Sequence, residues 1–298
     1  MSIAVRHPSM DEVGSAAALL NAHSHALHGT DDTSLGELEV AWHAPEVEFP
    51  ADVFVADRDD GLVGYADVIP FGRTAWIDVR ATDPAAYDPL LEASIRRAET
   101  HATPHIRAFT SDQDHAAQEA LERVGFKPIR HGFRMMIDLA GELPEPQWPK
   151  GFAVRRFREG DERRFHQGHQ ESFADTWEFT PEPFENWSHW FMGPATFEPE
   201  HWFIVEQGEE LAAVAICRIS ETEDSAGWVR ILGVLPAYRR RGLAIALLQH
   251  VFRHFAEAGM KRVGLGVDAE NPTGAVALYE RAGMHVARRN LTYERVPR

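Results

Sequence analysis

The stretch Trp228-Val-Arg-Ile-Leu-Gly-Val-Leu-Pro-Ala-Tyr-Arg-Arg-Arg-Gly-Leu-Ala-Ile-Ala-Leu-Leu-Gln249 decides the fold. Residues 228–235 are largely apolar and β-prone, which predicts a strand that Pro236 ends. After the basic turn Arg239-Arg-Arg-Gly242, apolar residues recur at helical spacing from Leu243 to Phe255. A strand, a short glycine turn and a helix in this order predict a loop that presents backbone N–H groups at a helix N-terminus.

A loop of this kind is suited to bind a pyrophosphate group. The first N–H groups of a helix have no partner inside the helix, and the helix dipole favours negative charge there. Gly242 has no side chain to hold a phosphate away, Ala244 lets the backbone approach closely, and the arginines supply positive charge. The spacing fits neither the glycine pattern of dinucleotide-binding folds nor that of P-loops.

The chain also repeats itself. Ile3-Ala-Val-Arg6 resembles Phe152-Ala-Val-Arg155, and Phe54-Val-Ala-Asp57 resembles Phe203-Ile-Val-Glu206, each pair 149 residues apart. Near the end of each half, Leu121-Glu-Arg-Val-Gly-Phe126 resembles Tyr279-Glu-Arg-Ala-Gly-Met284. A repeat at constant spacing predicts two copies of one fold, each with a strand, helices, a strand pair, a buried strand, a helix, a strand, a helix and final strands.

The first copy lacks the loop. Five residues separate Pro84 from Leu90, whereas ten separate Pro236 from the matching Leu247. No Arg-x-x-Gly occurs there, Asp83 and Asp88 would repel phosphate, and Leu121 stands where the second copy has Tyr279. We therefore expect residues 1–140 to form a degenerate domain, residues 141–150, rich in Pro, to form a linker, and residues 151–298 to form the catalytic domain.

Two segments in the second half resemble signatures of the GNAT (GCN5-related N-acetyltransferase) family. The first, Arg239-x-x-Gly242-x-Ala244, resembles [RQ]-x-x-G-x-[GA]; the second, Asn271 to Met284, resembles N-x-x-[GA]-x-x-x-[LY]-Y-x-x-x-G-[FM]. The two-copy arrangement is similar to the mycothiol synthase group of tandem acetyltransferases. The resemblance implies an α/β (α+β) chain of two tandem GNAT folds, each a mixed, mostly antiparallel sheet flanked by helices.

The resemblance also implies acetyl-CoA as co-substrate, without a metal. The strand from Leu232 to Val234 is expected to splay from its neighbour and to bind the pantetheine arm through backbone groups, which would polarise the acetyl carbonyl. The residues implied in binding acetyl-CoA are Leu232, Gly233, Val234, Arg239, Arg240, Arg241, Gly242, Leu243, Ala244, Ile245, Asn271 and Tyr279.

The same resemblance implies direct attack of an amine on the thioester. Tyr279 stands where the family's tyrosine acts as general acid toward the departing thiolate. The base is open, because mycothiol synthases carry a glutamate six residues before the valine that matches Val234, and here that position is Trp228. Asp175 and Glu178 are the candidates for base or amine contact; Glu221, Glu223 and Asp224 are further ones.

The segment that holds Asp175 and Glu178 interleaves acids with aromatic residues. Two interpretations are open: carboxylates and aromatic rings around an organic cation, or a helical hairpin that packs its aromatic residues into the core. The aromatic residues are Phe173, Trp177, Phe179, Phe184, Trp187, Trp190 and Phe191.

Composition excludes several classes of function. The 298 residues are 44% hydrophobic and 26% charged, typical of a globular protein, and the formal net charge of −16 disfavours nucleic acid and anionic membranes as partners. The N-terminus has no apolar core of signal-peptide length, so we expect a cytoplasmic protein. Cys217 lies in an apolar run, which predicts a buried strand residue; His23, His25 and His28 fall on different helix faces, which disfavours a metal site.

Three functions compete. The first is an N-acetyltransferase for a primary amine of a small polar, cationic metabolite or antibiotic. The second is a mycothiol synthase-type enzyme that acetylates a cysteinyl pseudodisaccharide. The third is a non-catalytic, acetyl-CoA-binding regulatory protein. A monomer and a homodimer are both compatible with tandem copies of the fold.

Overall fold

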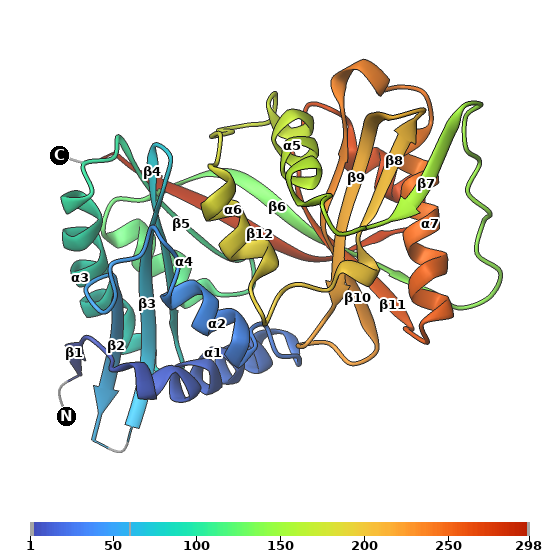
Figure 1. Cartoon of the computed structure of the whole chain (residues 1–298). Coiled ribbons are helices and arrows are strands. Elements are labelled where there is room, and N and C mark those ends of the chain that lie inside the picture. The colour runs from blue at the N-terminus through green and yellow to red at the C-terminus, as the bar shows by residue number, and fades with distance from the viewer. Residues whose placement is uncertain (1–2, 60, 297–298) are drawn as a thin grey trace. The chain divides into compact units, whose positions relative to one another are not determined.

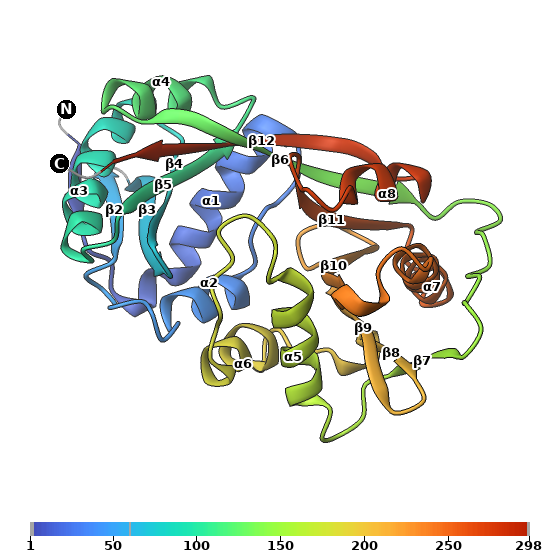
Figure 2. The same cartoon turned by 90° about the horizontal axis from the view of Figure 1, so that it is seen from above.

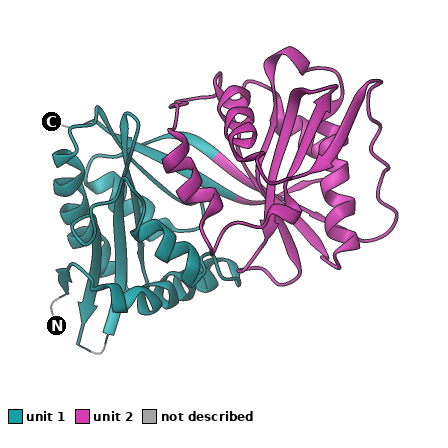
Figure 3. Ribbon diagram, viewed as in Figure 1, with its two compact units in different colours: residues 1–131, 289–298 teal, residues 132–288 magenta. Residues whose placement is uncertain are grey.

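A computed structural model of the chain describes residues 3–59 and 61–296 (Figure 1). The chain divides into two compact units, residues 1–131 with 289–298 and residues 132–288 (Figure 3). Each unit contains its own run of neighbouring strands and its own apolar core, and the two are described separately.

The first unit is a sheet with helices on both sides. Its strands follow the order β1-β2-β3-β4-β5, and the end of β12 is hydrogen-bonded to β5. All neighbours are antiparallel except β4 and β5, which are parallel. The elements are β1 (Ala4–Arg6), η1 (Met10–Glu12), α1 (Val13–His28), α2 (Leu35–Trp42), β2 (Val53–Arg58), β3 (Gly61–Phe71), β4 (Thr74–Ala81), η2 (Pro84–Ala86), α3 (Tyr87–Thr100), β5 (His105–Ser111) and α4 (His115–Arg123), and β6 (Lys127–Asp138) begins here.

The second unit repeats this arrangement. Its strands follow the order β6-β11-β10-β9-β8-β7, antiparallel except for the parallel pair β10 and β11. Its elements are β7 (Phe152–Arg156), α5 (Glu162–Phe173), α6 (Phe184–Met192), η3 (Pro199–His201), β8 (Phe203–Gln207), β9 (Glu210–Ile219), β10 (Ala226–Val234), η4 (Pro236–Tyr238), α7 (Leu243–Glu257), β11 (Arg262–Asp268), α8 (Ala275–Arg281) and the start of β12 (His285–Arg295). The predicted repeat is confirmed, because the strands and α-helices from β7 to β12 follow the same order as those from β1 to β6.

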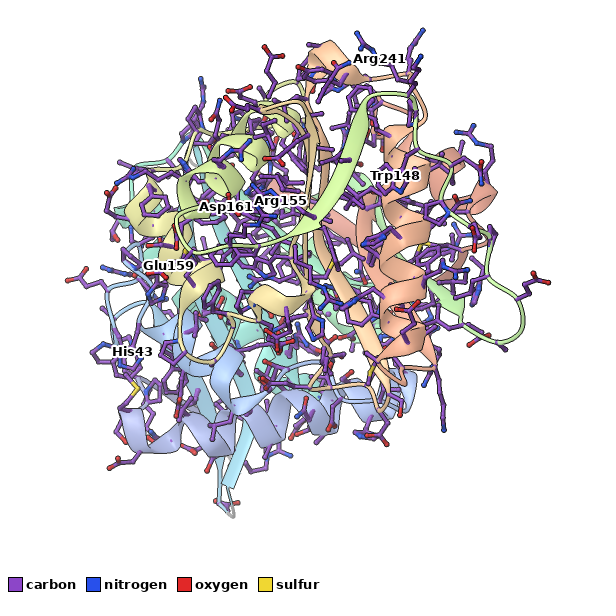
Figure 4. The ribbon with its side chains drawn as sticks, turned by 45° about the vertical axis from the view of Figure 1, so that its right-hand side comes forward. His43, Trp148, Arg155, Glu159, Asp161 and Arg241 are labelled. Carbon is purple, nitrogen blue, oxygen red and sulfur yellow. The ribbon has the colours of Figure 1, made fainter. Side chains whose placement is uncertain are left out.

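Local sequence explains several boundaries. Ser34 and Glu37 form a capping box at the start of α2, and Gly29 ends α1 in the left-handed conformation with φ 73°. Pro84 and Pro236 both open a short 3-10 helix after the central strand of their unit, where the missing N–H is not needed. In the second unit Arg155 pairs with Asp161 at 2.6 Å and ties β7 to the start of α5 (Figure 4).

The last strand of each sequence copy pairs with a strand of the other unit. Asn290–Arg295 of β12 pair with β5 in the first unit, and residues 132–138 of β6 pair with β11 in the second. The compact units therefore do not follow limits at residues 140 and 151. The Pro-rich segment 141–149 is irregular, as its composition predicts, but it lies within the second unit, where Leu143 and Trp148 pack against the core.

Two apolar layers enclose the sheet of the second unit. Strands β8 to β10 separate α5 and α6 on one side from α7 on the other (Figure 2). On the α7 side, Leu247, Leu248 and Phe255 are fully buried; on the α5–α6 side, Phe165, Trp187 and Trp202 are. Cys217 in β9 is fully buried, which confirms its predicted position in a buried strand.

Candidate active site

The sheet of the second unit opens between β10 and β11. The two strands pair only from Ala226 to Val229 with Arg262 to Leu265, whereas β10 continues to pair with β9 as far as Val234. A register shift between Val229 and Ile231 makes Arg230 a bulge residue at the point where the strands part. The splaying expected for residues 232–234 is confirmed, and among the described residues no strand pairs with that edge of β10.

The basic loop lies at the end of this strand. η4 ends at Tyr238, four residues connect it to α7, and two of these, Arg240 with φ 60° and Gly242 with φ 86°, are left-handed. Within the described residues, nothing accepts a hydrogen bond from the N–H groups of residues 240–245; the first helical bond runs from Ala246 N to Gly242 O at 3.2 Å. A nest of this kind, at the start of a 15-residue helix, is an anion-binding concavity.

Gly242 is needed for its backbone conformation. A Cβ added there would meet no atom within 4 Å, but φ 86° disfavours any L side chain. Gly233 on β10 is needed for space, because a Cβ there would lie 2.0 Å from Ser172 Oγ on α5. The close approach of α5 to the opened strand therefore depends on that glycine.

The side chain of Arg239 turns back toward the protein. It donates from Nε to the carbonyl of Val234 at 3.1 Å and from Nη2 to the carbonyl of Ser172 at 3.0 Å, and it forms a two-pronged ion pair with Asp175 at 2.5 and 2.9 Å. The hydrogen bond from Arg239 lowers the pKa of Asp175. Arg239 thus joins the end of β10 to the end of α5, and its guanidinium is engaged within the protein.

The other two arginines of the loop are exposed. Arg241 lies over the ring of Tyr238, 5.4 Å from its centroid, and donates to the carbonyl of Ala237 at 3.1 Å; Figure 4 shows it at the outer end of the loop. Leu243 is buried, and Ala244 and Ile245 are partly buried, as the first turn of α7 requires. Backbone N–H groups, with charge from Arg240 and Arg241, are therefore what the loop presents.

Asn271 and Tyr279 belong to the turn and helix that follow β11. Asn271 Oδ1 accepts from the backbone N of Thr273 at 2.9 Å and so shapes the turn before α8. Tyr279 is buried in α8, and no described residue hydrogen-bonds to its hydroxyl. Burial raises the pKa of Tyr279 to about 12, so the hydroxyl holds its proton at neutral pH.

The remaining acidic candidates for base or amine contact lie in different parts of the second unit. Glu178 is exposed, with φ 54°, in the connection between α5 and α6, and Glu221 and Asp224 are exposed in the turn before β10. Glu223 is buried and pairs with Arg134 of β6 at 2.5 Å. That arginine lies over the ring of Trp228, 4.5 Å from its centroid, so the position of the family's glutamate is covered by an arginine–tryptophan stack.

The aromatic segment forms core, which favours the helical-hairpin interpretation. Trp187 and Phe191 of α6 are buried with Phe165 and Trp202, and Phe173, Phe184 and Trp190 pack against them. Two residues of this face escaped the sequence analysis, Arg230 and His169. A lone charge inside an apolar strand was the signal for Arg230; no signal marked His169, because a helix spacing does not tell which neighbours a side chain meets.

The matching part of the first unit has no loop. η2 ends at Ala86 and α3 begins at Tyr87, which is fully buried. The carboxylate of Asp83 accepts from the N–H of Ala85 at 3.0 Å, so an internal acid occupies a position that a phosphate would need. β4 pairs with β3 without the register shift seen in β10, and Leu121 is fully buried.

Two clustered histidines of the first unit lie beside carboxylates. His23 pairs with Asp114 at 2.8 Å and His25 with Asp31 at 2.8 Å, so two of the three clustered histidines hold carboxylates. Across the described part of the chain, no group of three or more His, Cys, Asp or Glu side chains is arranged to hold a metal ion. Within residues 3–59 and 61–296, no helix combines the length and apolar character needed to span a membrane.

The fold and the site define a tandem α/β protein with an anion-binding loop beside an opened strand. Residues 162–284 match the model of the acetyltransferase (GNAT) family. The chain is 26% identical to a GCN5-related N-acetyltransferase from Sphaerobacter thermophilus, with a TM-score of 0.79 over 99% of this chain and 95% of that one. A tandem GNAT protein from the clavulanic acid biosynthesis pathway, 16% identical, shares the fold with a TM-score of 0.72 over 99% of this chain and 98% of that one.

Two relatives are mycothiol acetyltransferases. The one from Streptomyces bingchenggensis is 32% identical over 51% of this chain, and the one from Geodermatophilus obscurus is 30% identical over 60% of it. The matched segments span 49% and 59% of the length of these two relatives. Residues 162–284 therefore resemble an acetyltransferase (GNAT) domain, and the whole chain shares the fold of tandem GNAT structures.

Proposed function

We propose that this protein is an acetyl-CoA-dependent N-acetyltransferase whose second unit transfers acetyl to a primary amine of a small polar metabolite. One observation carries the proposal: the unpartnered N–H groups of residues 240–245 open α7 directly beside the strand edge that splaying leaves without a partner. An anion site next to an open strand edge fits a ligand with a pyrophosphate and an extended amide-bearing arm.

The residues of the second unit fit acetyl-CoA in a consistent way. Arg240 and Gly242 are left-handed, and the pyrophosphate would be held at this turn, where Leu243, Ala244 and Ile245 supply the first N–H groups of the helix. The free edge of Leu232, Gly233 and Val234 would pair with the pantetheine arm. Asn271 would border the arm through the turn that its side chain shapes.

Acetyl-CoA supplies the activated thioester, and the chain supplies position and a proton. Backbone N–H groups on β10 would stabilise negative charge on the carbonyl oxygen as the amine attacks. Tyr279, which is protonated at neutral pH as any tyrosine is, would hydrogen-bond to the departing thiolate and give it a proton.

Asp175 acts as a positioning residue in this proposal. A carboxylate that accepts two hydrogen bonds from Arg239 and whose pKa is lowered is a weak base, but it fixes the arginine that joins β10 to α5. Glu178, exposed near the end of α5, is the acid left for contact with the amine.

The first unit serves as scaffold. Asp83 fills the start of its helix region, no loop separates η2 from α3, and Leu121 cannot donate a proton. We therefore assign one acetyl-CoA site to each chain.

A panel of primary amines tests the activity. Purified protein is incubated with acetyl-CoA and each amine, free CoA is measured with a thiol reagent, and the acetylated product is identified by mass spectrometry. Product with at least one amine, and its loss in Gly242→Asp, is the expected result. Acetyl-CoA that binds but is never transferred would instead support the non-catalytic alternative.

The similarity to mycothiol acetyltransferases favours a second candidate, acetylation of a cysteinyl pseudodisaccharide. Trp228 at the position of that group's glutamate, covered by Arg134, weighs against it. The cysteinyl pseudodisaccharide is therefore included in the panel, and a kcat/KM for it far above those of simple amines would select this candidate.

A further inference from the structure

Arg230 is a cation at the apex of the opened sheet. It is the bulge residue of β10, immediately after the last pair that β10 makes with β11. The next residue, Ile231, packs in the apolar cluster under α5 and α6, so the bulge brings the guanidinium to the face opposite α7. Residues at such bulges are often aimed at a site.

The guanidinium of Arg230 is held by α6 without a counter-ion. Nη1 donates to the carbonyl of Trp190 at 2.9 Å, and the group lies over the ring of Phe191, 4.2 Å from its centroid. Among the described residues, no carboxylate oxygen lies within 4.0 Å of this guanidinium, so no ion pair forms. Burial, reinforced by the charge of Arg218 on β9, lowers the pKa of Arg230 to about 9.

The charged side chains near Arg230 include a second arginine and an acid that is already paired. Arg218 pairs across the strands with Trp228, beside the bulge. The buried acid of this face, Glu223, is already matched by Arg134 at 2.5 Å. Keeping a partly buried arginine without a carboxylate costs stability, and groups kept at such a cost often mark binding sites.

His169 of α5 lies against Phe191, the ring that also covers Arg230, and offers a second hydrogen-bond donor. Its ring centroid lies 5.6 Å from that of Phe191, and Trp187 Nε1 donates to its Nδ1 at 3.0 Å. Burial lowers the pKa of His169 to about 4, so the ring is neutral, and with Nδ1 as acceptor its hydrogen is on Nε2. No described residue accepts from that Nε2–H.

We propose that Arg230 binds a carboxylate of the acyl acceptor, so that the acceptor is an amino-acid-like molecule with both an amine and a carboxylate. Nη1 is engaged with Trp190 and one face is covered by Phe191, which leaves the Nε–Nη2 edge, the edge that holds a carboxylate with two parallel hydrogen bonds. His169 Nε2–H, which belongs to a ring against the same Phe191, would add a third. This assignment rests on the proposed acetyltransferase activity, and it names a different acceptor from the cationic amine that the acidic sequence suggests.

The test uses matched acceptors. Free L-amino acids are compared with the corresponding amino-acid amides, which keep the amine and side chain but lack the carboxylate. Initial rates of CoA release give kcat/KM for wild type, Arg230→Met, Arg230→Lys and the control Arg163→Met. Arg163 lies over Phe184 of α6 at 4.3 Å, a similar cation–ring contact at the outer part of the α5–α6 pair. Calorimetry of acetyl-CoA binding and thermal unfolding are recorded for every variant.

The expected result is a preference of wild type for amino acids over their amides and a selective loss in the variants. For amino acids, Arg230→Met should lower kcat/KM by at least ~30-fold, the loss typical of an unpaired buried charge, and Arg230→Lys by about tenfold. The rates with amides should fall much less, and Arg163→Met should keep the wild-type preference. A purely structural role would lower both classes of acceptor alike.

Other outcomes overturn the inference. Acetyl-CoA binding with transfer to amides as fast as to amino acids, or with no transfer to any amino acid, would show that Arg230 does not bind an acceptor carboxylate. Absence of acetyl-CoA binding to the wild type would remove the proposed function itself and the inference with it, so the two failures are distinguished by the calorimetry.

Discussion

Arg239 and Asp175 form a two-pronged ion pair at 2.5 and 2.9 Å that joins the basic loop before α7 to the end of α5. The same guanidinium donates to the carbonyls of Val234 and Ser172. The first arginine of the signature thus holds the loop in place, while the backbone that follows it presents the N–H groups.

Asp175→Ala should weaken acetyl-CoA binding without changing the pH dependence of turnover. The side chain of Asp175 is 54% exposed, so the pair contributes roughly 0.5–1 kcal/mol, and the dissociation constant should rise about two- to fivefold. Calorimetry and a pH–rate profile measure both. Glu171→Ala, which removes an exposed α5 acid that accepts a hydrogen bond from Gln167, is the control. Loss of the acidic limb of the profile in Asp175→Ala, where the rate falls because a base becomes protonated, would make Asp175 the base after all.

Gly242→Ala should lower both stability and acetyl-CoA affinity. A left-handed alanine costs ~1–2 kcal/mol, and relief of that strain would turn the N–H groups away from the anion, with about a tenfold loss of affinity. Gly259→Ala is a matched control, because Gly259 has φ 84°, also meets no atom within 4 Å, and lies at the other end of α7. Equal losses of affinity in both variants would show that the loop has no special part in binding.

Tyr279→Phe should lower kcat by roughly 10²- to 10⁴-fold and leave acetyl-CoA affinity and stability close to wild type. The hydroxyl has no hydrogen-bond partner within the described residues, so its removal breaks no contact. Tyr293→Phe, in a buried tyrosine of the first unit, should keep the full rate. Unchanged turnover in Tyr279→Phe would remove Tyr279 from catalysis.

A histidine pair predicts acid lability of the second unit. His254 Nε2 lies 2.7 Å from His201 Nδ1, and Arg156 donates to His254 Nδ1 at 3.3 Å, so the ring is held neutral. Burial and the charge of neighbouring groups lower the pKa of His254 to about 4. The unfolded chain binds the proton near pH 6.5, so stability should fall as pH decreases from about 6.5 to 4, by at most ~1.4 kcal/mol per pH unit.

Denaturant unfolding between pH 4 and 8 measures that slope. His254→Gln should flatten it, and His285→Gln, at an exposed position of β12, should leave it in place. An unchanged slope in His254→Gln would place the acid sensitivity elsewhere.

The sequence predicted the helices and strands of this fold better than it predicted which strands or side chains contact one another. Constant spacing revealed the repeat, and the pattern around Gly242 located the loop, because both are local properties. The exchange of β6 and β12 was not predictable, since alternating apolar residues mark a strand but do not tell which neighbour it joins. For the same reason the sequence gives no sign of the ion pair of Asp175, the candidate for base or amine contact: its partner, Arg239, lies 64 residues away in the chain.

The most direct test of the central claim is a calorimetric titration of acetyl-CoA into the whole chain and into Gly242→Asp, with Gly259→Asp as control. A negative side chain inside the loop should repel pyrophosphate, whereas the same change at the far end of α7 should not. One site per chain that disappears only in Gly242→Asp is the predicted result. Two sites in the wild type, or one that survives Gly242→Asp, would contradict a single acetyl-CoA site in the second unit.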